Sequence, residues 1–86
     1  MRYYPIFLDL QGRPCLVVGG GEVAERKVRS LLQAGGQVTV ISPALTPQLR
    51  SWEAERRIAV LSRPYETGDL NGFALVFAAT DDEALQ

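Results

Sequence analysis

The 86-residue sequence contains no histidine, only one cysteine and almost no net charge, with nine Lys and Arg against ten Asp and Glu. Without histidine, no Ser-His or Cys-His catalytic pair exists within this chain. The single cysteine, Cys15, excludes an internal disulfide and a multi-cysteine zinc site. A net charge of -1 gives no general attraction to nucleic acid or anionic lipid, so we expect neither as a partner. Any chemistry must use backbone amides, hydroxyls, carboxylates or a bound cofactor.

Long apolar runs are also missing. The longest uncharged apolar stretch, residues 73–80, is too short to span a bilayer, and residues 1–5 lack the apolar core of a secretory signal. The composition, 47% hydrophobic and 22% charged, is that of a globular protein rather than a disordered one. We therefore expect a cytoplasmic domain without a membrane segment.

A strand, a helix and a second strand follow one another in the first half of the chain. Residues 15–18 are a continuous apolar run, typical of a strand buried on both faces. The next apolar residues recur at helical spacing, and Gly35-Gly36 supplies a helix stop. Residues 38–41 are β-branched and predict the second strand. The three elements form a βαβ unit.

The second half repeats this alternation more weakly. Thr46-Pro47 predicts a helix start, residues 58–61 and 74–79 predict strands, and residues 64–72 a loop. Thr80 to Glu83 has the form of a capping box, but residues 80–86 are too few to cover a sheet face. We expect an α/β fold, the N-terminal part (about four strands) of a Rossmann-like doubly wound parallel sheet.

The glycine-rich turn is the motif that carries chemistry. Residues 19–24, GGGEVA, fit G-x-G-x-x-G/A between a buried strand and an amphipathic helix. Gly19 permits the tight turn, Gly21 leaves room for a pyrophosphate, and Ala24 lets the helix pack closely on the strand. The N–H groups of the first helical turn then point at the phosphates. The candidate cofactor-binding residues of this turn are Gly19, Gly20, Gly21, Glu22 and Val23. A simple turn is the alternative, but it rarely needs three glycines.

The end of the second strand offers Ser42, Pro43 and Ala44 as further cofactor-binding candidates. The acidic residue that usually binds the adenine ribose is missing, since no Asp or Glu lies between Glu25 and Glu53. Ser42 can bind a ribose hydroxyl or serve as a turn residue. No Arg stands nearby for a 2′-phosphate, so these residues alone do not choose between NAD and NADP.

Thr80 and Asp81 are the remaining candidates, at the carboxyl end of the fourth strand. They can contact the nicotinamide half of a dinucleotide, cap a helix, or do both. Adjacent carboxylates at a helix start are more often caps than ligands, so no metal site is expected. Cys15 is expected in the core and Tyr65 in core or loop packing.

Two strings are more specific than the glycine pattern: V-G-G-G-x-V-A-x-R-K at 18–27 and A-A-T-D-D at 78–82. With the Pro5-Ile6-Phe7 lead-in, they resemble the N-terminal domain of siroheme synthase, the precorrin-2 dehydrogenase / sirohydrochlorin ferrochelatase family. The resemblance runs over almost the whole chain.

This resemblance implies a homodimeric enzyme that oxidises precorrin-2 to sirohydrochlorin with NAD and then inserts ferrous iron to give siroheme. The family's NAD contacts fall on Glu22-Val23 and Pro43-Ala44. Its catalytic aspartate falls downstream of Gln86, so no catalytic residue is assigned here. Residues 1–86 are then an NAD-binding domain truncated before the dimerisation and catalytic segments, and we expect it to be inactive alone.

A non-catalytic nucleotide-sensing module of a regulatory or transport protein is the alternative. An acidic residue after the second strand would favour such a sensor, and it is missing. The Pro5-Ile6-Phe7 lead-in also suits the siroheme family better.

Overall fold

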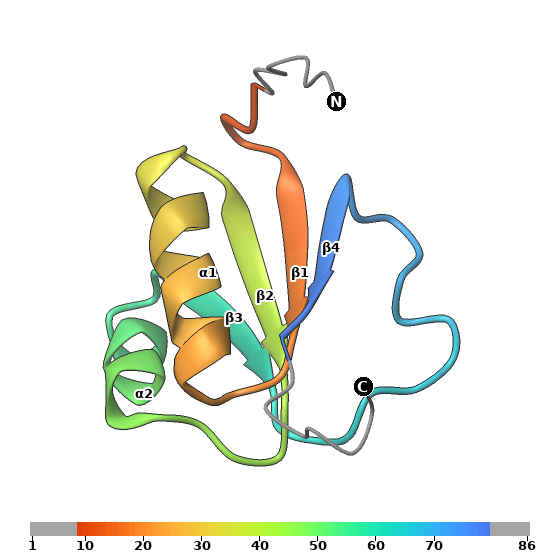
Figure 1. The fold of residues 1–86 in the computed structure, drawn as a ribbon. Coiled ribbons are helices and arrows are strands. Elements are labelled where there is room, and N and C mark those ends of the chain that lie inside the picture. Colours follow the sequence, from red (N-terminus) through yellow and green to blue (C-terminus); the bar gives the residue numbers. More distant parts are fainter. Residues whose placement is uncertain (1–8, 80–86) are drawn as a thin grey trace, which may run out of the picture.

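A computed structural model describes residues 9–79, which form a parallel sheet with two helices (Figure 1). The elements, in chain order, are β1 (Pro14–Val18), α1 (Glu22–Gln33), β2 (Gln37–Ile41), α2 (Pro47–Ala54), β3 (Ile58–Leu61) and β4 (Leu75–Ala78). The strand order is β3-β2-β1-β4, and every neighbouring pair is parallel. The predicted Rossmann-like arrangement is confirmed, because the order reverses at β1 as it does in a doubly wound sheet.

The helix boundaries follow local sequence signals. α1 ends at Gln33, after which Gly35 has a φ of 82° and the Gly36 N–H bonds back to the Leu31 carbonyl. α2 begins after Thr46, whose side chain accepts a hydrogen bond of 3.2 Å from the Leu49 N–H. The glycine stop and the Thr46 cap are therefore both confirmed.

Both helices cover the same face of the sheet. Ala24, Val28 and Leu31 of α1 and Leu49 and Trp52 of α2 are buried in one cluster with alternate strand residues. The strand members of that cluster are Cys15, Val17, Val38, Val40 and Ile58. The predicted core position of Cys15 is confirmed, since none of its surface is exposed.

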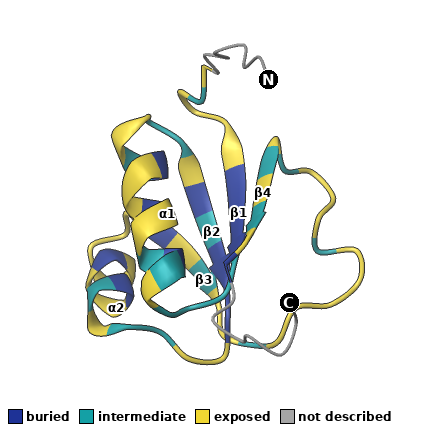
Figure 2. Ribbon diagram, in the orientation of Figure 1, coloured by how far each residue is buried: buried dark blue, intermediate teal, exposed yellow. Residues whose placement is uncertain are grey.

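The opposite face is less well covered within residues 9–79. Leu16 and Ile41 are fully buried there, whereas Leu61 of β3 and Val76 of β4, in the two edge strands, are exposed. Figure 2 shows the buried residues of the sheet in dark blue, mainly in the central strands β1 and β2. Fewer residues are buried in the edge strands β3 and β4 than in the central strands β1 and β2. Within residues 9–79, neither helix has the length and apolar character that a membrane span needs.

The β3–β4 connection, residues 62–74, contains turns but neither a helix nor a strand. It carries the chain from one edge of the sheet to the other, past the carboxyl ends of the central strands (Figure 1). The predicted loop at 64–72 is thus confirmed. The capping box at Thr80 lies outside the described residues.

Candidate cofactor site at the glycine-rich turn

A cavity of about 280 Å³ opens where β1 and β2 end. It is lined by Val18, Gly19, Gly20, Gly21, Ile41, Ser42, Pro43, Tyr65 and Ala79. The fold thus brings the glycine turn together with the residues that follow β2, as expected for the crevice at the switch point of a doubly wound sheet.

The structure explains why glycine stands at two of the three positions of the turn. Gly19 has a φ of 125°, a conformation that L side chains rarely adopt, and its N–H bonds to the Ile41 carbonyl at 2.9 Å. A side chain on Gly20 would collide with the backbone carbonyl oxygen of Ala44. Gly21 has a φ of -91°, which any residue can adopt. Backbone conformation therefore explains Gly19, and close packing explains Gly20, but the conformation of Gly21 does not require glycine.

The start of α1 presents uncapped backbone N–H groups near this cavity. Gly21 is the N-cap residue, and α1 has no side-chain cap hydrogen bond. The first N–H groups of a helix have no partner within the helix, and the helix dipole favours an anion beside them. The Glu25 N–H already bonds to the Gly21 carbonyl at 2.9 Å. The earlier groups, including those of Glu22 and Val23, suit a phosphate.

The side chains of Glu22 and Val23 do not line the glycine cavity. Glu22 is exposed and borders a separate hollow with Thr46 and Pro47. Val23 is half-buried and packs against the helix-side core. Any contribution of these two residues to a ligand in the glycine cavity therefore comes from the backbone.

Ser42 is buried and its hydroxyl is used within its own turn. The Oγ donates to the Ala44 carbonyl at 2.7 Å and accepts from the Ala44 N–H at 3.3 Å. Of the two roles considered for Ser42, the turn role is the one seen in the structure; a ribose contact stays a prediction. Pro43 lines the cavity, while Ala44 has its carbonyl packed on Gly20. Thr80 and Asp81 lie outside the described residues.

Tyr65 is a cavity residue that sequence reasoning assigned to packing. It belongs to the β3–β4 connection and lines the glycine cavity while 41% of its surface stays exposed. No local pattern marks it. The relevant signal is topological, because a residue shortly after β3 lies at the same edge of the sheet as the glycine turn.

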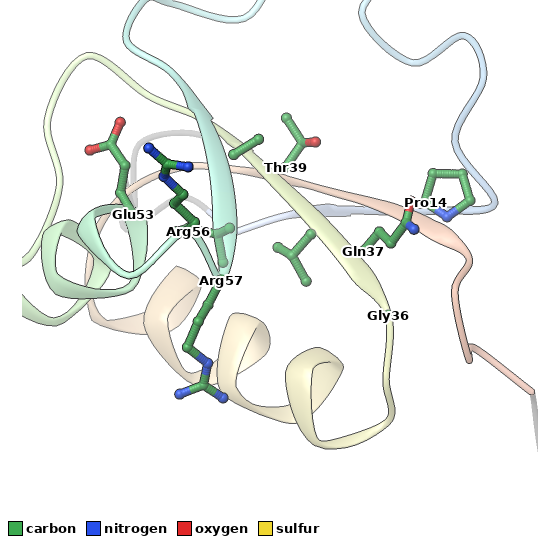
Figure 3. Close-up of a pocket in the computed structure, with 10 residues that line it drawn as sticks. Pro14, Gly36, Gln37, Thr39, Glu53, Arg56 and Arg57 are labelled. Carbon is green, nitrogen blue, oxygen red and sulfur yellow. The ribbon is translucent and has the colours of Figure 1, made fainter.

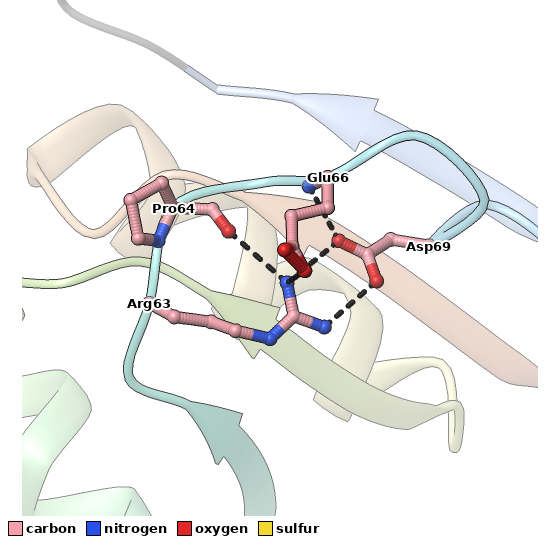
Figure 4. Close-up of polar contacts among 4 residues, drawn as sticks. All are labelled: Arg63, Pro64, Glu66 and Asp69. Atoms are coloured by element: carbon pink, nitrogen blue, oxygen red, sulfur yellow. Dashed lines mark hydrogen bonds and ion pairs between the residues drawn. The ribbon is translucent and has the colours of Figure 1, made fainter.

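An ion pair closes the segment that carries Tyr65. The Arg63 guanidinium bonds to both Asp69 carboxylate oxygens, at 2.9 and 2.7 Å, and the Glu66 N–H donates to Asp69 at 2.6 Å (Figure 4). These hydrogen bonds, led by that from Arg63, lower the pKa of Asp69 to about 2. The Arg63 charge is therefore already paired.

A second cavity, of about 450 Å³, lies at the other end of the strands, where β1, β2 and β3 begin (Figure 3). Its lining includes Pro14, Gln37 and Ile58, which begin β1, β2 and β3, together with Arg56 and Arg57. Ligands of doubly wound sheets bind at the carboxyl ends of the strands, so the glycine cavity is the better cofactor site.

Within residues 9–79, no group of three or more Cys, Asp and Glu side chains could hold a metal ion.

Comparison with known proteins agrees with the geometry of the glycine turn. Residues 6–86 match a family model described as "Putative NAD(P)-binding". Siroheme synthases of Methylobacillus flagellatus and Thioalkalivibrio sulfidiphilus are 55% identical over 82 residues and 51% identical over 85 residues. These matches cover 95% and 99% of this chain, but only 18% and 17% of the relatives.

A solved structure, "SirC, precorrin-2 dehydrogenase", superposes with a TM-score of 0.87 at 36% identity. The superposition covers 96% of this chain and 42% of that one. The chain thus spans less than a fifth of the curated relatives and less than half of the solved structure. It belongs to the NAD(P)-binding family of that model and corresponds to the N-terminal domain of siroheme synthase.

Proposed function

We propose that this chain is the NAD-binding part of an enzyme that oxidises precorrin-2 to sirohydrochlorin. The observation that carries the proposal is the glycine turn at the carboxyl end of β1, in a chain of an NAD(P)-binding family. The backbone conformation of Gly21 does not require glycine, and space for a pyrophosphate supplies the missing reason. The choice of precorrin-2 as substrate is based on the similarity to siroheme synthases and to the precorrin-2 dehydrogenase structure.

Each candidate residue has a role in this proposal. The pyrophosphate lies beside Gly21, with the N–H groups of Glu22 and Val23 as donors. Ser42, Pro43 and Ala44, after β2, are assigned to the adenosine ribose. Thr80 and Asp81, which lie outside the described residues, are assigned to the nicotinamide half. Gly19 and Gly20 shape the turn. When bound, NAD supplies the hydride acceptor, while these residues hold and orient it.

NAD is favoured over NADP by the charge of the cavity. The residues that line it carry no charged side chain, and Arg63, two positions before Tyr65 in the chain, is paired with Asp69. A 2′-phosphate would thus have no cation among these described lining residues, and an unpaired anion in a cavity loses solvation.

For the full-length protein, the proposal includes insertion of ferrous iron as a substrate, a homodimer and a cytoplasmic location.

The test is turnover and binding by the full-length protein. With NAD and precorrin-2, we expect sirohydrochlorin and NADH in equal amounts. The substitution Gly21→Asp places a carboxylate where the pyrophosphate belongs and should lower NAD affinity by at least about tenfold. Ser51→Asp, which adds the same charge on the exposed side of α2, is the matched control and should leave NAD affinity unchanged.

Two outcomes would contradict the proposal in different ways. Unchanged NAD affinity in a folded Gly21→Asp protein would overturn the binding mode. Tight NAD binding without oxidation of precorrin-2 would instead favour the nucleotide-sensing alternative.

A further inference from the structure

Tyr65 stands out among the residues of the glycine cavity because it supplies the one aromatic ring in the described lining. The remaining lining residues are small or aliphatic apart from Ser42, whose hydroxyl is engaged with Ala44. An aromatic ring that is partly exposed at a ligand cavity offers a flat apolar surface on which a nucleobase can stack.

Hydrogen bonds within the β3–β4 loop join residues on both sides of Tyr65. Arg63 reaches Asp69 across six positions of the sequence through two short bonds, and Arg63 also donates to the Pro64 carbonyl at 3.0 Å. The Glu66 N–H also donates a hydrogen bond to the Asp69 carboxylate. Tyr65 lies between these anchor points (Figure 4 shows the neighbouring Pro64 and Glu66). Although this loop contains no helix or strand, these hydrogen bonds hold residues 63–69 in a defined conformation.

The neighbours of Tyr65 indicate which half of a dinucleotide it meets. The cavity wall includes Ile41, Ser42 and Pro43, at the end of β2, and the Ser42 N–H bonds to the Leu61 carbonyl at the end of β3. In doubly wound sheets, the residues after β2 bind the adenine ribose. Tyr65, four positions after the end of β3, therefore stands on the adenosine side.

We propose that Tyr65 stacks on the adenine of the bound dinucleotide and that the Arg63–Asp69 ion pair positions it there. The inference rests on the proposed function, because it assumes that a dinucleotide binds in the glycine cavity. It adds a recognition residue on a loop outside the glycine motif. It also makes the ion pair a positioning element that touches no ligand.

The test compares ligands that contain adenine with one that does not. NAD, ADP-ribose and nicotinamide mononucleotide are titrated calorimetrically into the full-length protein and its variants. Tyr65→Ala should weaken NAD and ADP-ribose equally, by about five- to fiftyfold, and leave nicotinamide mononucleotide unaffected. Tyr65→Phe keeps the ring and should stay within about twofold of the unsubstituted protein. Leu70→Ala, which changes an exposed side chain of the same loop outside the cavity lining, is the control for general loop damage.

The ion pair is tested through its dependence on Tyr65. Asp69→Asn should lower NAD affinity several-fold when Tyr65 is present and should have no further effect in the Tyr65→Ala background. Additive losses would show that Asp69 acts on its own and would overturn the positioning role. A loss in Leu70→Ala as large as that in Tyr65→Ala would overturn the stacking role.

Failure of this inference can be told apart from failure of the proposed function. If Gly21→Asp abolishes NAD binding while Tyr65→Ala has no effect, the dinucleotide site stands and the role of Tyr65 is wrong. If the unsubstituted protein binds neither NAD nor ADP-ribose, the proposed function itself is wrong.

Discussion

The backbone carbonyl of Ala44 occupies the space that a side chain on Gly20 would need. The Gly20 carbonyl in turn accepts a hydrogen bond of 3.0 Å from the Thr46 N–H, and the Ser42 hydroxyl also lies against Gly20. The glycine turn and the loop after β2 are therefore one packed unit. These contacts join the two sides of the cavity directly, so we expect a substitution that shifts one loop to shift the other.

Substituting Gly20 and Gly21 separately should distinguish folding from ligand binding. Gly20→Ala forces two backbone segments apart and should lower the free energy of unfolding by about 1–3 kcal/mol. Gly21→Ala fits its backbone conformation, so its stability should change by less than about 1 kcal/mol. Its NAD affinity should fall by about tenfold, because the methyl group enters the space proposed for the pyrophosphate.

Thermal unfolding and NAD titration of the two full-length variants measure these effects. A Gly20→Ala protein as stable as the unsubstituted one would contradict the packing role. Full NAD affinity in Gly21→Ala would show that the pyrophosphate does not approach this residue.

The architecture was predictable because the local signals agree with one another. The apolar run before the glycines, the 3.6-residue spacing of α1 and the Thr46 cap each indicate the element that the structure contains. Strand boundaries shifted by one residue at Pro14, Gln37, Leu75 and Ala78. Such shifts arise because hydrogen bonds to neighbouring strands, which a single sequence does not display, define where a strand ends.

The packing around the cavity was less predictable. The motif gives Gly19 and Gly21 separate roles, but it gives no reason for a glycine at position 20, and only the approach of the Ala44 carbonyl explains Gly20. Tyr65 and the Arg63–Asp69 pair lie in a stretch without periodicity, where no local rule indicates which side chains meet. The approach of Ala44 to Gly20 and the place of Tyr65 in the cavity depend on contacts between segments that are distant in sequence. The Arg63–Asp69 pair depends on the path of an irregular loop, which no periodic pattern specifies.

The Thr46 cap should contribute measurably to the stability of α2. Its hydroxyl accepts from the Leu49 N–H, and loss of such a cap costs about 1 kcal/mol. Thr46→Ala should therefore raise the exchange rate of the α2 backbone amides by about fivefold in hydrogen exchange of the full-length protein. Ser51→Ala, at an exposed position of the same helix, is the matched control and should not raise that rate. Equal rates in both variants would contradict the cap.

Cys15 should resist modification while the protein is folded. Its side chain is fully buried, its thiol donates to the Arg13 carbonyl at 3.5 Å, and burial raises the pKa of the thiol. Thiolate is the reactive form, so alkylation by iodoacetamide at mildly alkaline pH should be at least about a hundredfold slower in the native protein than in urea. Mass spectrometry of the peptide that contains Cys15 measures both rates. Similar rates in the two conditions would show that the β1 core opens readily.

The Arg63–Asp69 pair should make the loop contribute to stability in a pH-dependent way. The pKa of Asp69 is about 2 in the folded protein against an ordinary value of 3.8, so the unfolded chain binds the proton more readily. The contribution is therefore fully present above the ordinary value and is lost as the pH falls through about 2. Asp69→Asn removes this titration and leaves the other carboxyl groups in place. In urea unfolding of the full-length protein, the stability difference between the unsubstituted protein and Asp69→Asn should be constant near neutral pH and shrink as the pH falls from 4 to 2. A difference that does not change with pH would mean that Asp69 is not held by Arg63 in solution.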